Sequence, residues 1–175
     1  MPPAMDGFTF PVGYHEFHRS QVFNFQLNRW HSLGYARYQD MAEAGARIET
    51  FAGWKAEMVR QADKALSEKR RLNAAFYYRA AEFYCRPDDP DKTGLYDRFT
   101  DLFYDLYRDQ GIERVALPYD GGAIRTMRVP PKDGARRDII ILHGGFDSFM
   151  EEFFSWMVFF ANRGFEVIAF EGPGQ

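Results

Sequence analysis

The segment HGGF at positions 143–146 has the clearest chemical pattern in the chain, and it follows the apolar run IIIL. In an open α/β sheet, ligands bind where loops leave the carboxyl ends of the strands. Adjacent glycines there let backbone N–H groups approach a substrate and stabilise the negative oxygen that forms when a carbonyl is attacked. We therefore predict an oxyanion-binding loop. For His143 we favour a ring hydrogen-bonded to the backbone, which fixes the loop, over a role as a base.

Two acidic residues follow this loop. Glu151 and Glu152 lie about one turn into the helix that we expect to begin at Ser148. Both are candidates for a polar contact with a substrate. The alternative is a structural role, because the helix dipole favours acidic side chains near a helix N-terminus.

The elements that must position these residues are predicted from periodicity. The run DIIILHGG predicts a strand buried on both faces, as in a parallel sheet, and FEVIAF predicts a second buried strand. Residues 148–162 between them predict an amphipathic helix, so the three form a right-handed βαβ unit. Before this unit, IERVALPY and AIRTMRV predict a hairpin, because YDGG between them is a turn signal.

The first 110 residues have a different, helical period. Apolar residues at helical spacing predict helices over 51–66, 74–84 and 94–110, with a break at 67–73. Pro87 and Pro90 indicate a loop after the second helix, and Gly111 is an end signal for the third. We therefore expect a helical region over 1–110 and a sheet region over 111–175.

Three weaker groups could bind a metal or react. His15, His18 and His31 could be metal ligands, since His15 and His18 lie three residues apart, but two histidines without a clear third and fourth ligand favour surface or capping roles. The acidic residues of RPDDPDKTG resemble part of a calcium loop, but the two prolines and the missing distal glutamate favour a plain turn. Cys85 is expected to be a small buried apolar residue. We expect no metal site.

Composition excludes several classes of protein. The chain has 175 residues, and 22 Lys and Arg against 25 Asp and Glu give a formal charge of −3. This balance offers no basic surface for nucleic acid or a membrane. The longest strongly apolar stretch, 153–161, is shorter than the roughly 18 residues of a membrane span. With one cysteine and no N-terminal secretory signal, we expect a reduced, cytoplasmic protein.

A hairpin followed by IIILHGG, a helix and FEVIAFEGPGQ resembles the opening of the α/β-hydrolase fold. HGGFDSFMEE together with EGPGQ, behind a helical segment containing YYRAAEFY, is similar to one branch of that family. The branch contains 2,6-dihydroxypseudooxynicotine hydrolase and the fungal polyketide-shortening hydrolases. The resemblance implies a helical cap over 1–110 and the first strands and helix of a hydrolase core over 111–175. It also implies oxyanion donors at the amides of Gly145 and Phe146, room provided by Gly144, and a pocket floor shaped by Gly172 and Gly174.

The activity implied by the resemblance is that of a serine-type hydrolase, which cleaves an ester or a carbonyl-flanked carbon–carbon bond without a cofactor. The family places its serine in a G-x-S-x-G turn after the next strand, followed by an acid and a histidine. The chain has no G-x-S-x-G sequence, so we expect the nucleophile, acid and base beyond Gln175. Two parallel strands and one hairpin bury too little for a stable domain. We therefore expect a truncated, cleaved or split protein, inactive as this chain alone.

The implied partners are a small-molecule substrate, the missing C-terminal half, for example as a second chain, and a second copy in a homodimer. Nucleic acid and membranes are not expected. Aromatic residues make up 18% of the chain, which favours a bulky, aromatic or polyketide-like substrate. Two other functions stay open. Residues 54–85 resemble a tetratricopeptide-type hairpin of a protein-binding module, although one hairpin is not an array. The chain could also be a catalytically inactive fragment.

Overall fold

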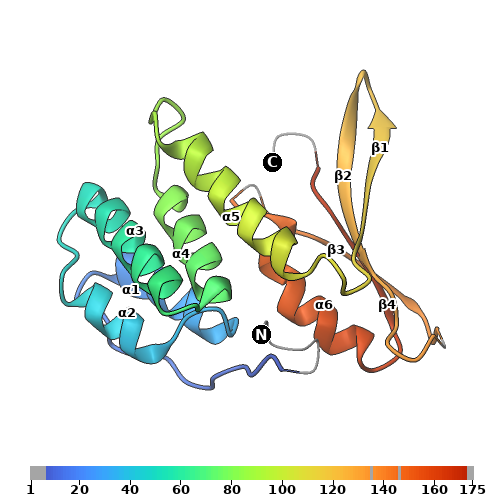
Figure 1. Cartoon of the computed structure of the whole chain (residues 1–175), viewed down its shortest axis with the longest axis horizontal. Coiled ribbons are helices and arrows are strands. Elements are labelled where there is room, and N and C mark those ends of the chain that lie inside the picture. Colours follow the sequence, from blue (N-terminus) through green and yellow to red (C-terminus); the bar gives the residue numbers. More distant parts are fainter. Residues whose placement is uncertain (1–6, 135, 146, 173–175) are drawn as a thin grey trace. The chain divides into compact units, whose positions relative to one another are not determined.

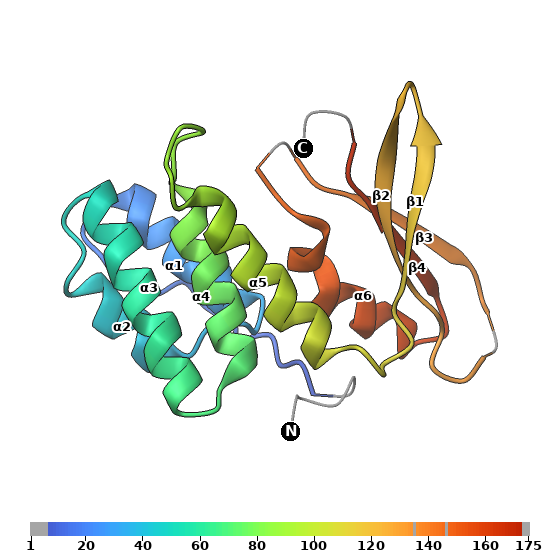
Figure 2. The ribbon, with the colours of Figure 1, turned by 45° about the horizontal axis from the view of Figure 1, so that its top comes forward.

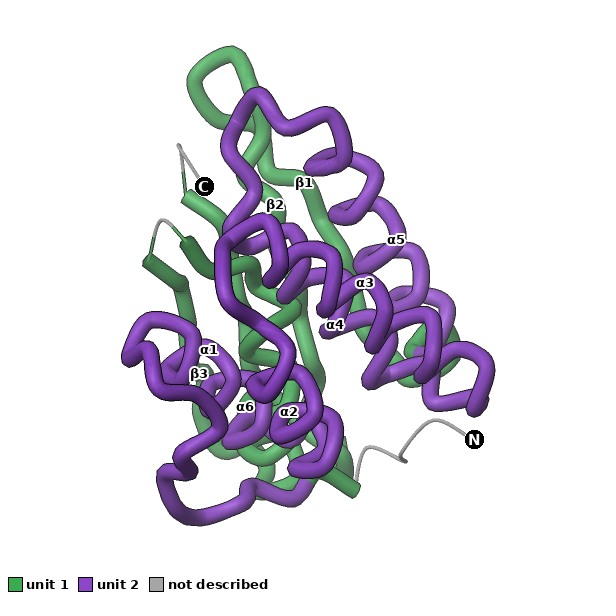
Figure 3. Tube along the Cα trace, turned by 90° about the vertical axis from the view of Figure 1, so that its left-hand side faces the viewer, with its two compact units in different colours: residues 1, 3–8, 107–175 green, residues 2, 9–106 purple. Residues whose placement is uncertain are grey.

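The computed structural model describes residues 7–134, 136–145 and 147–172. The chain divides into two compact units (Figure 3). Of the described residues, 9–106 belong to a helical unit, and 7–8 with those from 107 onward belong to a unit built on a sheet. Within the described residues, no helix combines the length and the apolar character that crossing a bilayer requires.

Helices make up the secondary structure of the first unit (Figures 1 and 2): α1 (Gln21–Ser32), α2 (Tyr38–Gly45), α3 (Phe51–Ser67), α4 (Arg71–Phe83) and α5 (Lys92–Leu106). Their apolar faces meet in an aromatic core. Trp30, Trp54 and Phe76 are fully buried, and the Tyr35 ring stacks on Phe76 with 3.5 Å between ring centroids. Aromatic side chains bury much apolar area each, so a few of them fill the core of a small unit.

The predicted break between α3 and α4 is present, but it is shorter than expected. The N–H groups of Lys69 and Arg70 return to the carbonyls of Leu66 and Ala65, and Lys69 has a φ of 59°. This paired arrangement satisfies the last carbonyls of α3 and turns the chain at once. Helix α4 therefore begins at residue 71 rather than 74, and α5 spans 92–106 rather than 94–110.

The second unit holds β1 (Glu113–Tyr119), β2 (Gly122–Val129), β3 (Ile139–His143), the 3-10 helix η1 (Met150–Phe153), α6 (Phe154–Ala161) and β4 (Glu166–Phe170). The strand order is β1-β2-β4-β3. Strands β1 and β2 are antiparallel, β2 and β4 are antiparallel, and β3 and β4 are parallel. The predicted hairpin and the predicted strand–helix–strand unit are therefore both present, and β4 lies between β2 and β3.

One prediction about the strands is wrong. The apolar run of β3 was expected to be buried on both faces, but Ile139 is 42% and Ile141 is 58% exposed. Strand β3 pairs with β4 alone among the described strands, so it lies at the edge of this sheet. Strand β4 is the buried one, with Val167 and Ala169 fully covered. A continuous apolar run indicates a strand, but it does not distinguish a central strand from an edge strand.

The helix expected over 148–162 also differs from the prediction. Phe149 keeps an extended backbone, η1 begins at Met150, and the α-helix proper covers only 154–161. It is apolar on more than one face, since Trp156 and Phe159 remain 43% and 38% exposed. Helix α6 packs on β4 and β2.

Candidate active site

The loop after β3 is tightly packed at its first glycine. A Cβ added to Gly144 would lie 2.8 Å from Ser148 Cβ and 3.1 Å from Phe153 Cε2, whereas one added to Gly145 would meet its nearest atom at 3.7 Å. Real Cβ atoms essentially never approach within 3.0 Å of another atom. Gly144 therefore lets the loop fold back onto the start of the following helix. Phe146, the other expected donor, lies outside the described residues.

His143 ends β3 and makes a backbone contact. Its Nδ1 donates to the Gly144 carbonyl oxygen at 2.9 Å, and its ring packs on that of Phe170 with 5.5 Å between centroids. The residue is exposed. This geometry matches a ring that holds the loop, and no base function is needed to account for it.

The amides that follow the loop are used within the chain. The Ser148 N–H donates to the Gly145 carbonyl at 3.3 Å. The Phe149 N–H donates to Glu152 Oε1 at 3.1 Å, and the Met150 N–H donates to Glu171 Oε1 at 3.3 Å. These three donors therefore already have acceptors within the chain.

Glu151 and Glu152 are both only 1% exposed. Glu152 caps the start of η1 through the Phe149 N–H, which is the structural role weighed from the sequence. Glu171 was missed. It directly follows β4. Loops and helix starts gather at the carboxyl ends of strands, so a polar residue at this position could have been expected to contact one of them. Gly172 comes next and is described, whereas Gly174 lies outside the described residues.

The chain is similar to known proteins in sequence and in fold, although no family model matches it. Hydrolase LUC6 of a Fusarium species is 30% identical over an alignment of 193 positions, gaps included. The alignment covers 92% of this chain and 45% of that protein. The structure of AbyA5 aligns with a TM-score of 0.65 at 25% identity, over 78% of this chain and 40% of that one. The structure of 2,6-dihydroxy-pseudo-oxynicotine hydrolase aligns with a TM-score of 0.57 at 24% identity, over 84% of this chain and 45% of that one.

The chain has the fold of the N-terminal part of an α/β-hydrolase. The resemblance drawn from the sequence is confirmed, since other curated relatives are also fungal proteins named hydrolases. The chain spans less than half the length of the relatives it matches.

The histidines of the helical unit contact other groups of the same unit. His18 Nε2 donates to the Ile48 carbonyl at 2.9 Å, and its Nδ1 accepts the Ser20 N–H at 2.8 Å. The His15 and His31 rings pack edge-on with 5.2 Å between their centroids. Within the described ranges, no three His, Cys, Asp or Glu residues gather as metal ligands do.

The acidic loop before α5 is filled by a lysine. Lys55 Nζ donates to Asp89 at 2.8 Å and to Asp91 at 2.9 Å. These carboxylates raise the pKa of Lys55 well above its usual value. The ammonium group of Lys55 thus neutralises the oxygens that a calcium ion would need. Burial raises the pKa of Cys85 nearby to about 11, so its thiol is protonated at neutral pH and weakly reactive.

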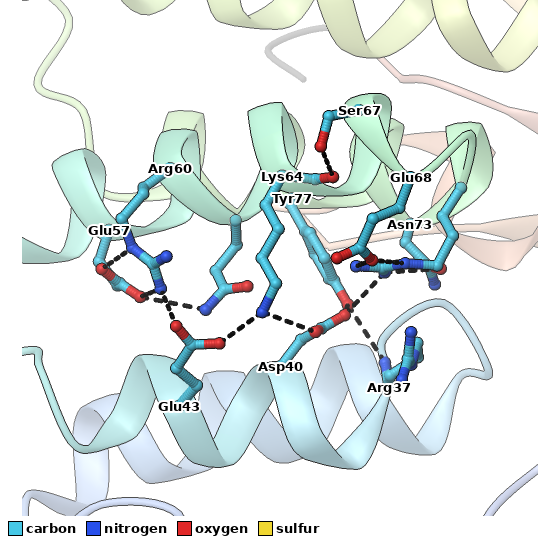
Figure 4. A network of polar contacts seen from close by, with 12 residues as sticks. Arg37, Asp40, Glu43, Glu57, Arg60, Lys64, Ser67, Glu68, Asn73 and Tyr77 are labelled. Atoms are coloured by element: carbon cyan, nitrogen blue, oxygen red, sulfur yellow. Dashed lines mark hydrogen bonds and ion pairs between the residues drawn. The ribbon is translucent and has the colours of Figure 1, made fainter.

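A polar network that the sequence did not reveal joins α2 to α3 and α4 (Figure 4). Asp40 is 2% exposed and accepts hydrogen bonds at 2.7 Å from both the Tyr77 hydroxyl and Arg70 Nη1. Burial, with the Asp40 charge beside it, raises the pKa of Tyr77 well above its usual value. The Tyr77 hydroxyl therefore stays a donor, and the Asp40 carboxylate is compensated by two partners.

The same network continues one turn along α2. Glu43 accepts hydrogen bonds at 2.6 Å from Lys64 Nζ and from Arg60 Nη2. These contacts lower the pKa of Glu43 to about 2. The network accounts for the packing of the helical unit and contains no group poised for chemistry.

The helical unit also carries an open groove of about 1420 Å³ between the segment at 14–19, α1 and the end of α2. Its lining mixes apolar rings such as Tyr14 and Phe25 with the charges of Glu16, Arg19 and Glu49. No single ligand chemistry is favoured by this mixture.

Proposed function

We propose that this chain supplies the oxyanion-binding loop of a serine-type hydrolase. The donors are the amides of Gly145 and Phe146, and Gly144 provides the close turn. The observation that carries the proposal is the close turn at Gly144 directly after β3, where an added Cβ would lie 2.8 Å from Ser148 Cβ. The match to proteins named hydrolases supports it.

The proposed reaction is acyl transfer. A serine oxygen attacks the substrate carbonyl carbon while a histidine takes the serine proton, and the carbonyl oxygen becomes negative against the loop amides. Collapse breaks the bond to the leaving alcohol, or to the leaving carbon, and the histidine returns the proton to it. Water then hydrolyses the acyl-enzyme and releases an acid. The substrate is a bulky ester or carbonyl-flanked carbon–carbon compound, with aromatic compounds favoured. The reaction needs no cofactor.

The serine, acid and histidine are proposed to lie in a further part of the protein that completes the sheet beside β3. Strand β3 supports this, because it pairs on one side only among the described strands and exposes Ile139 and Ile141. We further propose a cytoplasmic protein that forms a homodimer and binds neither nucleic acid nor membranes.

The test begins with intact-mass analysis of the protein purified natively and then denatured. We expect a longer chain or a second polypeptide beside the 20.4 kDa species. That material should hydrolyse p-nitrophenyl esters and lose the activity on labelling by a fluorophosphonate, which reacts with activated serines. A preparation that contains only the 20.4 kDa chain and still hydrolyses esters would overturn the proposed division of the site. A complete protein without activity or labelling would overturn the hydrolase.

A further inference from the structure

We infer that Glu171 is a positioning residue for the turn between the glycine segment and η1, acting through the Met150 N–H; this inference rests on the proposed function. The carboxylate accepts that N–H at 3.3 Å across 21 positions of sequence. It touches the backbone at the far end of the loop and not the expected donors themselves. Its effect on hydrolysis would therefore be indirect.

Glu171 is itself anchored in the sheet. Its backbone N–H donates to the Arg125 carbonyl of β2 at 3.0 Å, directly after the last residue of β4. The side chain thus extends from a backbone held by two neighbouring strands. A hydrogen bond from such an anchor restrains its partner more than one from a free loop would.

Both ends of the loop are fixed to adjacent residues of one strand end. His143 is the register partner of Phe170 in the parallel pair of β3 and β4. Met150, at the other end, is bonded to Glu171, the next residue along. His143 and Met150 are thus held beside two consecutive residues, Phe170 and Glu171, at the end of β4.

This bracing matters because oxyanion donors act by position. Removing one such donor costs about 10²–10³ in kcat, and a misplacement of about 1 Å can cost about 10²-fold. Without the Glu171 carboxylate, the Met150 N–H would turn to water and the start of η1 could shift away from β4. Glutamine retains an acceptor oxygen, so charge is not required for the role.

The experiment compares Glu171→Ala and Glu171→Gln with the wild-type protein, in its complete form, on a p-nitrophenyl ester. We expect Glu171→Ala to lower kcat by about 10- to 100-fold with KM within about 2-fold, and Glu171→Gln to restore kcat to within about 3-fold. The pH profile should keep its wild-type shape in all three, because Glu171 transfers no proton. Glu166→Gln is the matched control: Glu166 begins the same strand and pairs with Arg128, far along β4 from the loop.

Backbone hydrogen exchange provides the second readout. Glu171→Ala should speed exchange at Met150 by about 10-fold or more, while Glu171→Gln and Glu166→Gln should leave it near the wild-type rate. Wild-type kcat together with wild-type exchange in Glu171→Ala would overturn the inference, as would a Gln variant as impaired as the Ala variant. If the wild-type protein itself proves inactive, the proposed function fails, and the exchange rates alone still decide whether Glu171 braces the loop.

Discussion

Gly144 is the residue at which the loop has least space. A methyl group there would overlap Ser148 Cβ, at 2.8 Å, and crowd Phe153. We expect Gly144→Ala to destabilise the protein by about 1–3 kcal/mol, measured by urea unfolding, because the loop or the helix start must move. Gly145→Ala is the matched control, since its nearest neighbour, Asp147 Oδ1, would lie at 3.7 Å. Equal losses in the two variants would contradict the close approach at Gly144.

The carboxylate of Glu43 is held in its charged form by two cationic partners. Lys64 and Arg60 lower its pKa to about 2 from the ordinary value of 4.5. Because the folded-state pKa is the lower one, the carboxylate stabilises the fold above pH 4.5, and this contribution is lost as the pH falls toward 2. Glu43→Gln should therefore be less stable than wild type at pH 7, and the gap should close across that window. Thermal unfolding at a series of pH values measures the gap; one that widens at low pH would refute this role.

Individual residues were predictable only where the sequence placed them close together. The HGGF segment lies in one run, so its loop could be expected at the end of a strand. The contacts of Glu171 with Met150, Tyr77 with Asp40 and Lys55 with Asp89 join residues 21, 37 and 34 positions apart. Such pairs depend on how helices and strands pack, which local spacing does not report.

The hairpin between β1 and β2 shows how a turn sets the register of an element. Asp120 and Gly121 have φ values of 43° and 75°, the left-handed pair that matches the twist of two antiparallel strands. We expect Gly121→Ala to cost about 1–2 kcal/mol of stability by thermal unfolding, because an L side chain resists this conformation. Gly122→Ala, outside the left-handed region, should be nearly neutral. A larger loss at Gly122 would argue against this turn geometry.

The loop between α4 and α5 has a testable property of its own. Since Lys55 already occupies the carboxylates of Asp89 and Asp91, we expect about 1 mM calcium to leave the melting temperature unchanged. Lys55→Met should lower that temperature, because two carboxylates lose their cation. Calcium-dependent stabilisation of the wild-type protein would show that the lysine is readily displaced.

Elements were predictable in kind but not in their place. The helical and β periods were clear after residue 50, so α3, α4, α5 and the hairpin were expected, whereas the spacing did not define α1 and α2. Some ends shifted by several residues: the backbone hydrogen bonds of Lys69 and Arg70 make a short turn, so α4 begins at 71 rather than 74. Strand β3 was predicted to be buried on both faces and is an exposed edge strand among the described strands. An apolar run is compatible with the centre and with the edge of a sheet.

The edge strand β3 exposes apolar side chains. Ile139 and Ile141 are exposed on β3, which pairs on one side only among the described strands. Edge strands with apolar side chains promote association. We expect the 175-residue chain, expressed alone, to self-associate in light scattering and Ile141→Lys to reduce this. Val12→Lys is the control, because Val12 is exposed but lies in the helical unit. Equal effects of the two lysines would point away from β3.

Strand order has a consequence for how the chain is made. Strand β4 is the last of the described strands in sequence, yet it lies between β2 and β3. During synthesis, β2 and β3 have emerged from the ribosome before the strand that joins them exists. The four-stranded sheet can form only after residues 166–170 have emerged from the ribosome and paired with both β2 and β3. Non-local pairing of this kind is slow and leaves apolar strands exposed to chaperones in the interval. A nascent chain arrested before residue 166 should therefore have the hairpin but no four-stranded sheet.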